Sequence, residues 1–317
     1  MLKDLIYCLN ATMPIFLLMV IGFFLRRFGI LNKAITKDLN RFVFVVALPV
    51  LVFNELSREN FSDIWDTFFI LFCFLTTLAS IIILLIISKC SKKIYDKAEF
   101  VQASFRSSAA LLGVGIAENL YGRAGFVSLM IVGAVPLYNI TAVVLLSILK
   151  SGNNKNKLTK DVIFKTLKGI VTNPIIIGIA VGFIWSVLGI KKPFILDKTL
   201  NYVGGVATPI GLMALGASLE IKSFEKNAKT IALATFFKLI GFVAIFMPLA
   251  IHFGYKTDKL IAILIMLGSP TTVSSFVMAK SMGHEGQTSA GTVMCTTLLA
   301  AFSLTLWLFI MKRLGLI

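Results

Sequence analysis

The stretch LGSPTTVSSFVMAK, residues 267–280, places a helix breaker and a cluster of hydroxyl groups inside an otherwise apolar run. Pro270 cannot donate a backbone hydrogen bond to the preceding turn, and it disfavours helical geometry at Ser269. Taken as a helix start, Ser269 is an N-cap and Pro270 is the favoured first helical residue. The stretch therefore predicts a broken span made of two half-helices.

This broken span belongs to a chain with the composition of an integral membrane protein. Of the 317 residues, 57% are hydrophobic and 15% are charged, whereas soluble domains carry about 25% charged residues. The apolar residues form long blocks, such as 68–88, of the roughly 20 residues that cross a bilayer as a helix. Within hydrocarbon, irregular backbone survives only inside protein or beside a water-filled cavity. The break at Pro270 is therefore a candidate site.

Apolar blocks between loop signals predict an all-α fold with ten membrane spans. The blocks cover residues 5–25, 39–56, 67–88, 99–121, 124–149, 170–190, 200–219, 230–252, 259–281 and 287–311. The most polar linker lies between the fifth and sixth blocks. The chain therefore divides into five spans at 1–150, a linker at 151–168, and five spans at 169–317.

The two halves repeat each other weakly. LNRFVFVVALP (39–49) recurs as LNYVGGVATP (200–209), and SSAALLGVGIAENLYG (107–122) corresponds to SPTTVSSFVMAKSMG (269–283). An odd number of spans in each half forces the two copies into opposite orientations, which is the inverted-repeat plan of secondary transporters. The repeat also predicts that the fourth span is broken, at the depth where the ninth span is.

At that depth the fourth span carries Arg106, Ser107 and Ser108, a charge and two candidate caps. Two half-helix N-termini would then face the centre from opposite sides, and their free N–H groups and partial positive charge suit an anion. Thr271 and Thr272 add hydroxyl groups that can bind a substrate. The alternative is that the proline kink and the hydroxyls only shape helix packing. Arg106 itself either binds a substrate carboxylate or braces the break.

Other polar residues within the spans allow two interpretations each. Lys238 in the eighth span pins a helix pair or contacts substrate, and Asn139 satisfies backbone groups beside Pro136 or contacts substrate. Glu118 is a candidate coupling residue, but the spans hold no carboxylate dyad at mid-membrane depth. Proton coupling, sodium coupling and uniport are therefore all left open, as is a homodimer.

Charge and motif patterns set the orientation and exclude other classes. The net charge of +16 falls mainly in short loops, where an excess of Lys and Arg marks the cytoplasmic side and does not indicate nucleic acid. This predicts a multi-pass protein of the plasma (inner) membrane with a cytoplasmic 151–168 linker and both termini extracytoplasmic. Four isolated cysteines and two histidines argue against metal sites, and no cofactor is expected. No catalytic motif is present, so no enzyme is expected.

Five segments in order resemble the auxin efflux carrier family, which includes plant PIN carriers and bacterial malate or malonate permeases. They are FRSSAALLGVGIAENLYG (105–122), VPLYN (135–139), NPIIIGIAVG (173–182), TPIGLMALGASL (208–219) and SPTTVSSFVMAK (269–280). The resemblance implies ten helices in two inverted repeats, with a scaffold, a transport domain and crossing broken helices 4 and 9, similar to bile-acid symporters. One departure is Ser108, where the family commonly has an asparagine.

These patterns predict a secondary transporter of small organic anions, mono- or dicarboxylates such as malate, malonate or auxin-like acids. The substrate-binding candidates are Arg106, Ser107, Ser108, Asn139, Ser269, Pro270, Thr271 and Thr272, with Glu118 and Lys238 as coupling candidates. The alternative is an anion channel, or a membrane sensor that binds its ligand without transporting it.

Overall fold

The computed structural model describes residues 2–57, 65–91, 94, 96–108, 126–149, 168, 171–218 and 221–317. Within these ranges the protein is helical, and the β-type pairing in them is a single isolated bridge between Ser107 and Thr271. Among the described residues, five helical segments are long and apolar enough to cross a membrane: Thr67–Cys90, Leu129–Ile148, Phe194–Ser218, Glu225–His252 and Gln287–Arg313. The chain is thus built as a multi-pass helical membrane protein.

The helices of the first half overlap the predicted apolar blocks, although α2 begins at Lys33, ahead of the block at 39–56, and the fourth block is described as far as Ser108. They are α1 (Leu2–Arg27), α2 (Lys33–Phe42), the π-helical turn η1 (Val43–Ala47), α3 (Leu48–Ser57), α4 (Thr67–Cys90), α5 (Lys97–Phe105) and α7 (Phe126–Ile148).

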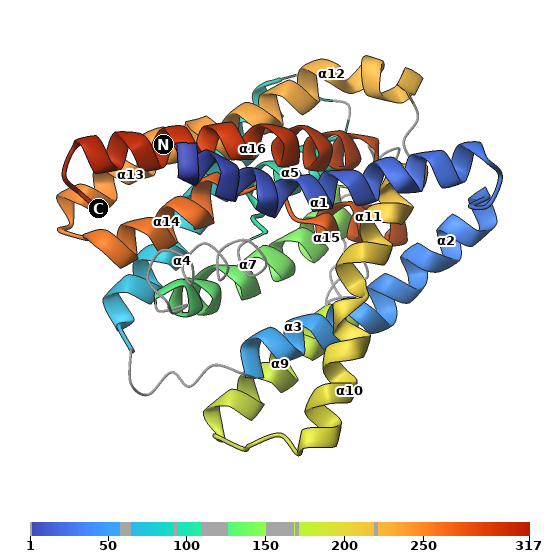
Figure 1. Cartoon of the computed structure of the whole chain (residues 1–317), viewed down its shortest axis with the longest axis horizontal. Helices are drawn as coiled ribbons and strands as arrows, with labels where there is room; N and C mark the ends of the chain where they lie inside the picture. The colour runs from blue at the N-terminus through green and yellow to red at the C-terminus, as the bar shows by residue number, and fades with distance from the viewer. Residues whose placement is uncertain are drawn as a thin grey trace.

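The helices of the second half also overlap predicted blocks, although α10 and α12 begin ahead of the blocks at 200–219 and 230–252. They are α9 (Pro174–Val187), α10 (Phe194–Gly205), α11 (Ala207–Ser218), α12 (Ile221–Phe236), the π-helical turn η4 (Phe237–Gly241), α13 (Phe242–His252), α14 (Thr257–Gly268), α15 (Val273–Ser281) and α16 (Gln287–Arg313). The two chain termini lie toward the same end of the molecule (Figure 1).

Local sequence signals explain where several helices begin. Asp66 accepts a hydrogen bond from the Phe69 amide at 3.0 Å and caps α4, and Asp96 caps α5 in the same way. Asn173 caps α9, with Pro174 at its first position. In each case a side-chain oxygen of the capping residue accepts a hydrogen bond from an N–H group that the start of a helix leaves without an intrahelical partner.

The described helices pack as two groups. One comprises α1, α2, α3, α9, α10 and α11, and we call it the α3 group; the other comprises α4, α5, α7 and α12 to α16, and we call it the α5 group, the two being joined most extensively where α1 packs against α16. In Figure 1 the helices α3, α9 and α10 form a lobe at the bottom, while α1 runs beside α16. Small residues permit the closest crossing, since a Cβ on Gly22 of α1 or Gly216 of α11 would collide with the backbone of the facing helix.

The ninth span is broken, but its second half starts later than the sequence predicts. Ser269 is the C-cap of α14, and Thr272 is the N-cap of α15. The prediction of Ser269 as N-cap and Pro270 as first helical residue is therefore wrong. The reason is tertiary, because pairing of Thr271 with Ser107 keeps the chain extended beyond the proline.

Candidate functional site

The end of α5 crosses the break between α14 and α15. The chain leaves α5 in an extended conformation at Arg106, and Ser107 forms the antiparallel bridge with Thr271. The Ser108 amide donates to the Pro270 carbonyl at 2.8 Å, and the Thr271 hydroxyl donates to the carbonyl of Ala103 at 2.7 Å. These bonds satisfy backbone groups that the interrupted helices leave free, which is required inside a membrane protein.

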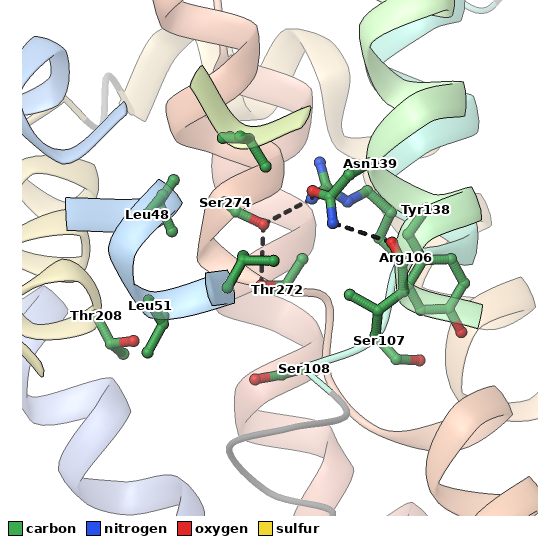
Figure 2. Close-up of a pocket in the computed structure, with 13 residues that line it drawn as sticks. Leu48, Leu51, Arg106, Ser107, Ser108, Tyr138, Asn139, Thr208, Thr272 and Ser274 are labelled. Atoms are coloured by element: carbon green, nitrogen blue, oxygen red, sulfur yellow. Dashed lines mark hydrogen bonds between the residues drawn. The ribbon is translucent and has the colours of Figure 1, made fainter. Parts of the chain in front are cut away.

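A cavity of about 70 Å³ opens at this crossing, between the α3 group and the α5 group (Figure 2). A water needs about 10–15 Å³ on this measure, so the space suits a small solute or a few waters. The α5 group supplies the polar wall: Arg106, Ser107, Ser108, Tyr138, Asn139, Thr272 and Ser274. The α3 group supplies a mostly apolar wall: Leu48, Leu51, Val52, Ile175 and Thr208.

Arg106 dominates the polar wall. Its Nη2 donates to Asn139 Oδ1 and to Ser274 Oγ, both at 2.8 Å, as Figure 2 shows. Its Nη1 donates to Met278 Sδ at 2.9 Å and to Gln102 Oε1 at 3.5 Å. These acceptors are all neutral, and the buried Nε has no partner in the described part of the chain. With 2% of its surface exposed, Arg106 has no acidic partner there either.

Buried arginines are costly and normally pair with a negative group. The guanidinium of Arg106 therefore places a positive charge at the cavity that the described side chains do not neutralise. The N-terminus of α15, which Thr272 caps, adds the partial positive charge of a helix start. The arrangement is chemically suited to an anion.

The structure brings together five of the predicted site residues. Arg106, Ser107, Ser108, Asn139 and Thr272 all line the cavity. The other predicted residues of the ninth-span break, Ser269, Pro270 and Thr271, lie in the crossing but outside the lining. The remaining two candidates are coupling residues: Lys238 is buried at the crossing but does not line the cavity, and Glu118 lies outside the described residues.

Eight lining residues were not singled out from the sequence: Leu48, Leu51, Val52, Val135, Tyr138, Ile175, Thr208 and Ser274. The repeated motif held a signal for two of them, since Leu48 and Thr208 each stand directly before its proline, in LNRFVFVVALP and LNYVGGVATP. Ser274 belongs to the hydroxyl run after the break. Tyr138 had no signal of its own.

Among the described residues, one buried cluster has the composition of a metal site: Asp96, Glu99 and His284. Glu99 accepts the amides of Gly286 at 2.6 Å and Ser289 at 2.9 Å, and so satisfies the start of α16. His284 bonds Asp96 at 2.8 Å, and its other ring nitrogen bonds a backbone carbonyl of α7 at 2.8 Å. Because these atoms are already engaged, the cluster fits a capping network that ties α5, α7 and α16 together.

The fold and cavity define a membrane protein with a solute-sized site where the end of α5 meets the interrupted span of α14 and α15, and sites at interrupted helices are typical of membrane transporters. The chain belongs to the membrane transport protein family, whose model matches residues 7–308, and this is the auxin efflux carrier family. It is a transporter and not an enzyme.

Three relatives illustrate the similarity. A putative malonate transporter of Rhizobium meliloti is 23% identical over 308 residues, covering 96% of this chain and 95% of the relative. An uncharacterized transporter of Methanocaldococcus jannaschii is 24% identical over 307 residues, covering 94% and 97%. The uncharacterized transporter YfdV of Escherichia coli is 22% identical over 329 residues, covering 96% and 98%.

Proposed function

We propose that the protein is a secondary transporter of small organic anions, mono- or dicarboxylates such as malonate, malate or auxin-like acids. The observation that carries the proposal is the buried guanidinium of Arg106, which lines the cavity without an acidic partner among the described residues. The name of the Rhizobium meliloti relative, a putative malonate transporter, supports this substrate class.

In the proposed complex a substrate carboxylate lies against the guanidinium of Arg106. The hydroxyls of Ser108 and Thr272 donate to its oxygens, and the first amides of α15 add to the positive potential. The carbon skeleton packs against Leu51 and Val52 of the opposite wall. Only one part of the cavity is charged, so monocarboxylates and short dicarboxylates are both compatible with it.

The proposed transport step is a displacement of the α5 group against the α3 group. The cavity lies between the groups, so such a displacement exposes it first to one side of the membrane and then to the other. We further propose ten helices in two inverted repeats, at 1–150 and 169–317. The shared position of Leu48 and Thr208 before the motif proline, with both side chains at the cavity, supports this repeat.

A second cavity supports an anionic substrate. It has a volume of about 690 Å³ and is bounded by α1, α2, α11 and α15 and the turn after α15. The ionisable side chains that line this second cavity are all basic: Arg26, Lys33, Lys37, Arg41, Lys280 and His284. Clefts lined by one sign of charge concentrate ligands of the opposite sign, so this second cavity would raise the local concentration of anions at the protein.

Uptake of radiolabelled malonate and malate into proteoliposomes tests the proposal. Saturable uptake, competed by unlabelled mono- or dicarboxylates, is the expected result. Absence of flux for every carboxylate tried would refute it, and single-channel currents far above carrier turnover would favour an anion channel. Saturable binding without flux would favour a sensor.

The proposed topology places both termini outside the cytoplasm and the 151–168 linker inside, in the plasma (inner) membrane. The exposed Cys90 at the end of α4 is a native probe for the same side as that linker. With the other cysteines replaced by serine, impermeant thiol reagents should label Cys90 only from the cytoplasmic side. A cysteine introduced at Ser151 should behave the same way, and labelling from outside would invert the topology.

A further inference from the structure

Lys238 is a second buried cation at the crossing, and substrate binding gives it no role. It lies in the π-helical turn η4, with 0% of its surface exposed. Its Nζ donates to the carbonyl of Leu267 at 2.8 Å, to the carbonyl of Met266 at 3.3 Å, and to Ser107 Oγ. Three donors thus meet three neutral oxygens, and no acidic side chain pairs with Lys238 in the described part of the chain.

The two carbonyls that Lys238 binds are those that the proline break sets free. In a continuous helix the Met266 carbonyl would accept from the amide of residue 270, but Pro270 has no N–H. The Leu267 carbonyl would accept from Thr271, whose amide donates instead to Thr296 Oγ1 at 3.0 Å. The free C-terminal end of α14 also carries partial negative charge, which favours a cation there.

Freed carbonyls at the C-terminal end of a half-helix are where secondary transporters coordinate a coupling sodium ion or proton. Here the ammonium of Lys238 already occupies those oxygens. We infer that Lys238 is a tethered cation standing in the place of a coupling sodium ion. Substrate binding and transport in the wild type are then independent of sodium. Without the ammonium, the three oxygens form a site for a small monovalent cation. The transport arm of the inference rests on the proposed function.

Matched substitutions separate the charge from the space it fills. Lys238→Ala removes the ammonium and opens room for a hydrated ion beside Ser107 and the two carbonyls. Lys238→Met also removes the charge, but its side chain keeps the space filled. Lys229→Met, at an exposed position of α12, controls for the loss of a lysine.

The full-length protein is compared in sodium chloride and in choline chloride of equal ionic strength, by thermal unfolding in detergent and by malonate uptake in proteoliposomes. Wild type and Lys229→Met should differ less than about twofold between the salts in uptake, and their unfolding midpoints should coincide. Lys238→Ala should lose about tenfold or more in uptake in choline and regain several-fold in sodium, with a sodium-dependent rise in midpoint. Lys238→Met should be impaired in both salts.

Two results would overturn the inference: sodium-dependent uptake by the wild type, or a folded Lys238→Ala variant indifferent to sodium in both measurements. If neither Lys238 variant folds, the salt response of the wild type decides alone. The unfolding measurement needs no transport. Absence of carboxylate flux in every variant would refute the proposed function, whereas sodium-dependent stabilisation of Lys238→Ala would still support the tethered cation.

Discussion

The two segments that cross at the cavity, the end of α5 and the break between α14 and α15, are built from different chemistry. The ninth-span break contains a proline and no charge, and Pro270 frees backbone carbonyls at the end of α14. The segment at the end of α5 contains a charge and no proline: α5 ends at Phe105, and its C-cap Arg106 has extended geometry. Arg106 brings a positive charge to the uncharged ninth-span break, because its side chain reaches Ser274 and Met278 of α15.

The comparison shows that the crossing is a mutual arrangement rather than two independent kinks. Ser107 of one break bonds the Met266 carbonyl that the other break exposes, and Thr271 of the second bonds Ala103 at the end of α5. A substitution in either of the two crossing segments should therefore affect the other segment as well. The substitution should change transport where the altered atom faces the cavity, and stability where the altered atom bonds within the crossing.

The largest effect is expected at Arg106. Arg106→Ala removes the charge at the cavity and leaves Asn139 and Ser274 without their donor, so affinity for malonate should fall about 30-fold or more. Arg106→Lys keeps the charge but loses the planar fork, and should lose about tenfold in affinity together with some thermal stability. Concentration-dependent uptake and unfolding midpoints measure both, with the exposed Arg27→Lys as control. Wild-type affinity combined with lower stability in Arg106→Lys would make Arg106 a brace alone.

Pro270→Ala should have the next largest effect. The alanine supplies an N–H that can bond the Met266 carbonyl and extend α14 into the crossing, in competition with Lys238 and Ser107. We expect uptake to fall about tenfold, since small displacements of binding groups cost that much or more, while the unfolding midpoint stays level or rises. Pro14→Ala, at the proline inside α1, is the matched control. Undiminished uptake by Pro270→Ala would reduce the break to a packing kink.

Adjacent threonines provide a sharper comparison within one break. Thr272 lines the cavity, where its hydroxyl bonds the neighbouring Ser274 hydroxyl at 3.2 Å, whereas the Thr271 hydroxyl is committed to the Ala103 carbonyl across the crossing. Thr272→Val should weaken malonate affinity about fivefold, equivalent to about 1 kcal/mol for one hydrogen bond, and leave the midpoint unchanged. Thr271→Val should do the reverse, lowering stability by about 1 kcal/mol at constant affinity. The opposite pattern would place the substrate on the Thr271 side of the crossing.

Local chemistry made part of this site predictable. A proline and its hydroxyl neighbours mark a helix break wherever they stand in a membrane span, and long apolar blocks mark the spans themselves. The start of α15 was misplaced because Thr271 is held extended by Ser107, a residue in the other half of the chain. Sequence periodicity contains no information about such a partner.

The surroundings of Lys238 and Tyr138 illustrate the same limit. The sequence gives the depth of Lys238 in its span, but the oxygens it binds come from the end of α14 and from Ser107. Tyr138 lines the cavity because α7 packs beside α14, a contact that only the tertiary fold defines. By contrast, Leu48 and Thr208 could have been found from the repeated motif, because both stand before its proline.

The smallest expected effect concerns a second tie between α5 and the ninth span, where the turn after α15 meets the start of α5. His284, in the turn after α15, bonds Asp96 at the start of α5 and a carbonyl of α7, and Glu99 also faces it. Burial acts to lower the pKa of His284, but the bonds to Asp96 and to the Leu146 carbonyl, together with the charge of Glu99, raise it above its ordinary value of 6.5.

A raised folded-state pKa means that the charged imidazolium stabilises the fold. This stabilisation is complete below about pH 6.5 and is lost as the pH rises through the raised value. The wild-type unfolding midpoint should therefore fall between pH 6 and 9 by a few degrees more than that of His284→Gln, which carries no titrating ring. His252→Gln, at an exposed position at the end of α13, should retain the wild-type slope. Equal slopes for wild type and His284→Gln would mean that His284 binds Asp96 as a neutral hydrogen-bonding group. The tie between α5 and the turn after α15 would then contribute to packing but not to pH dependence.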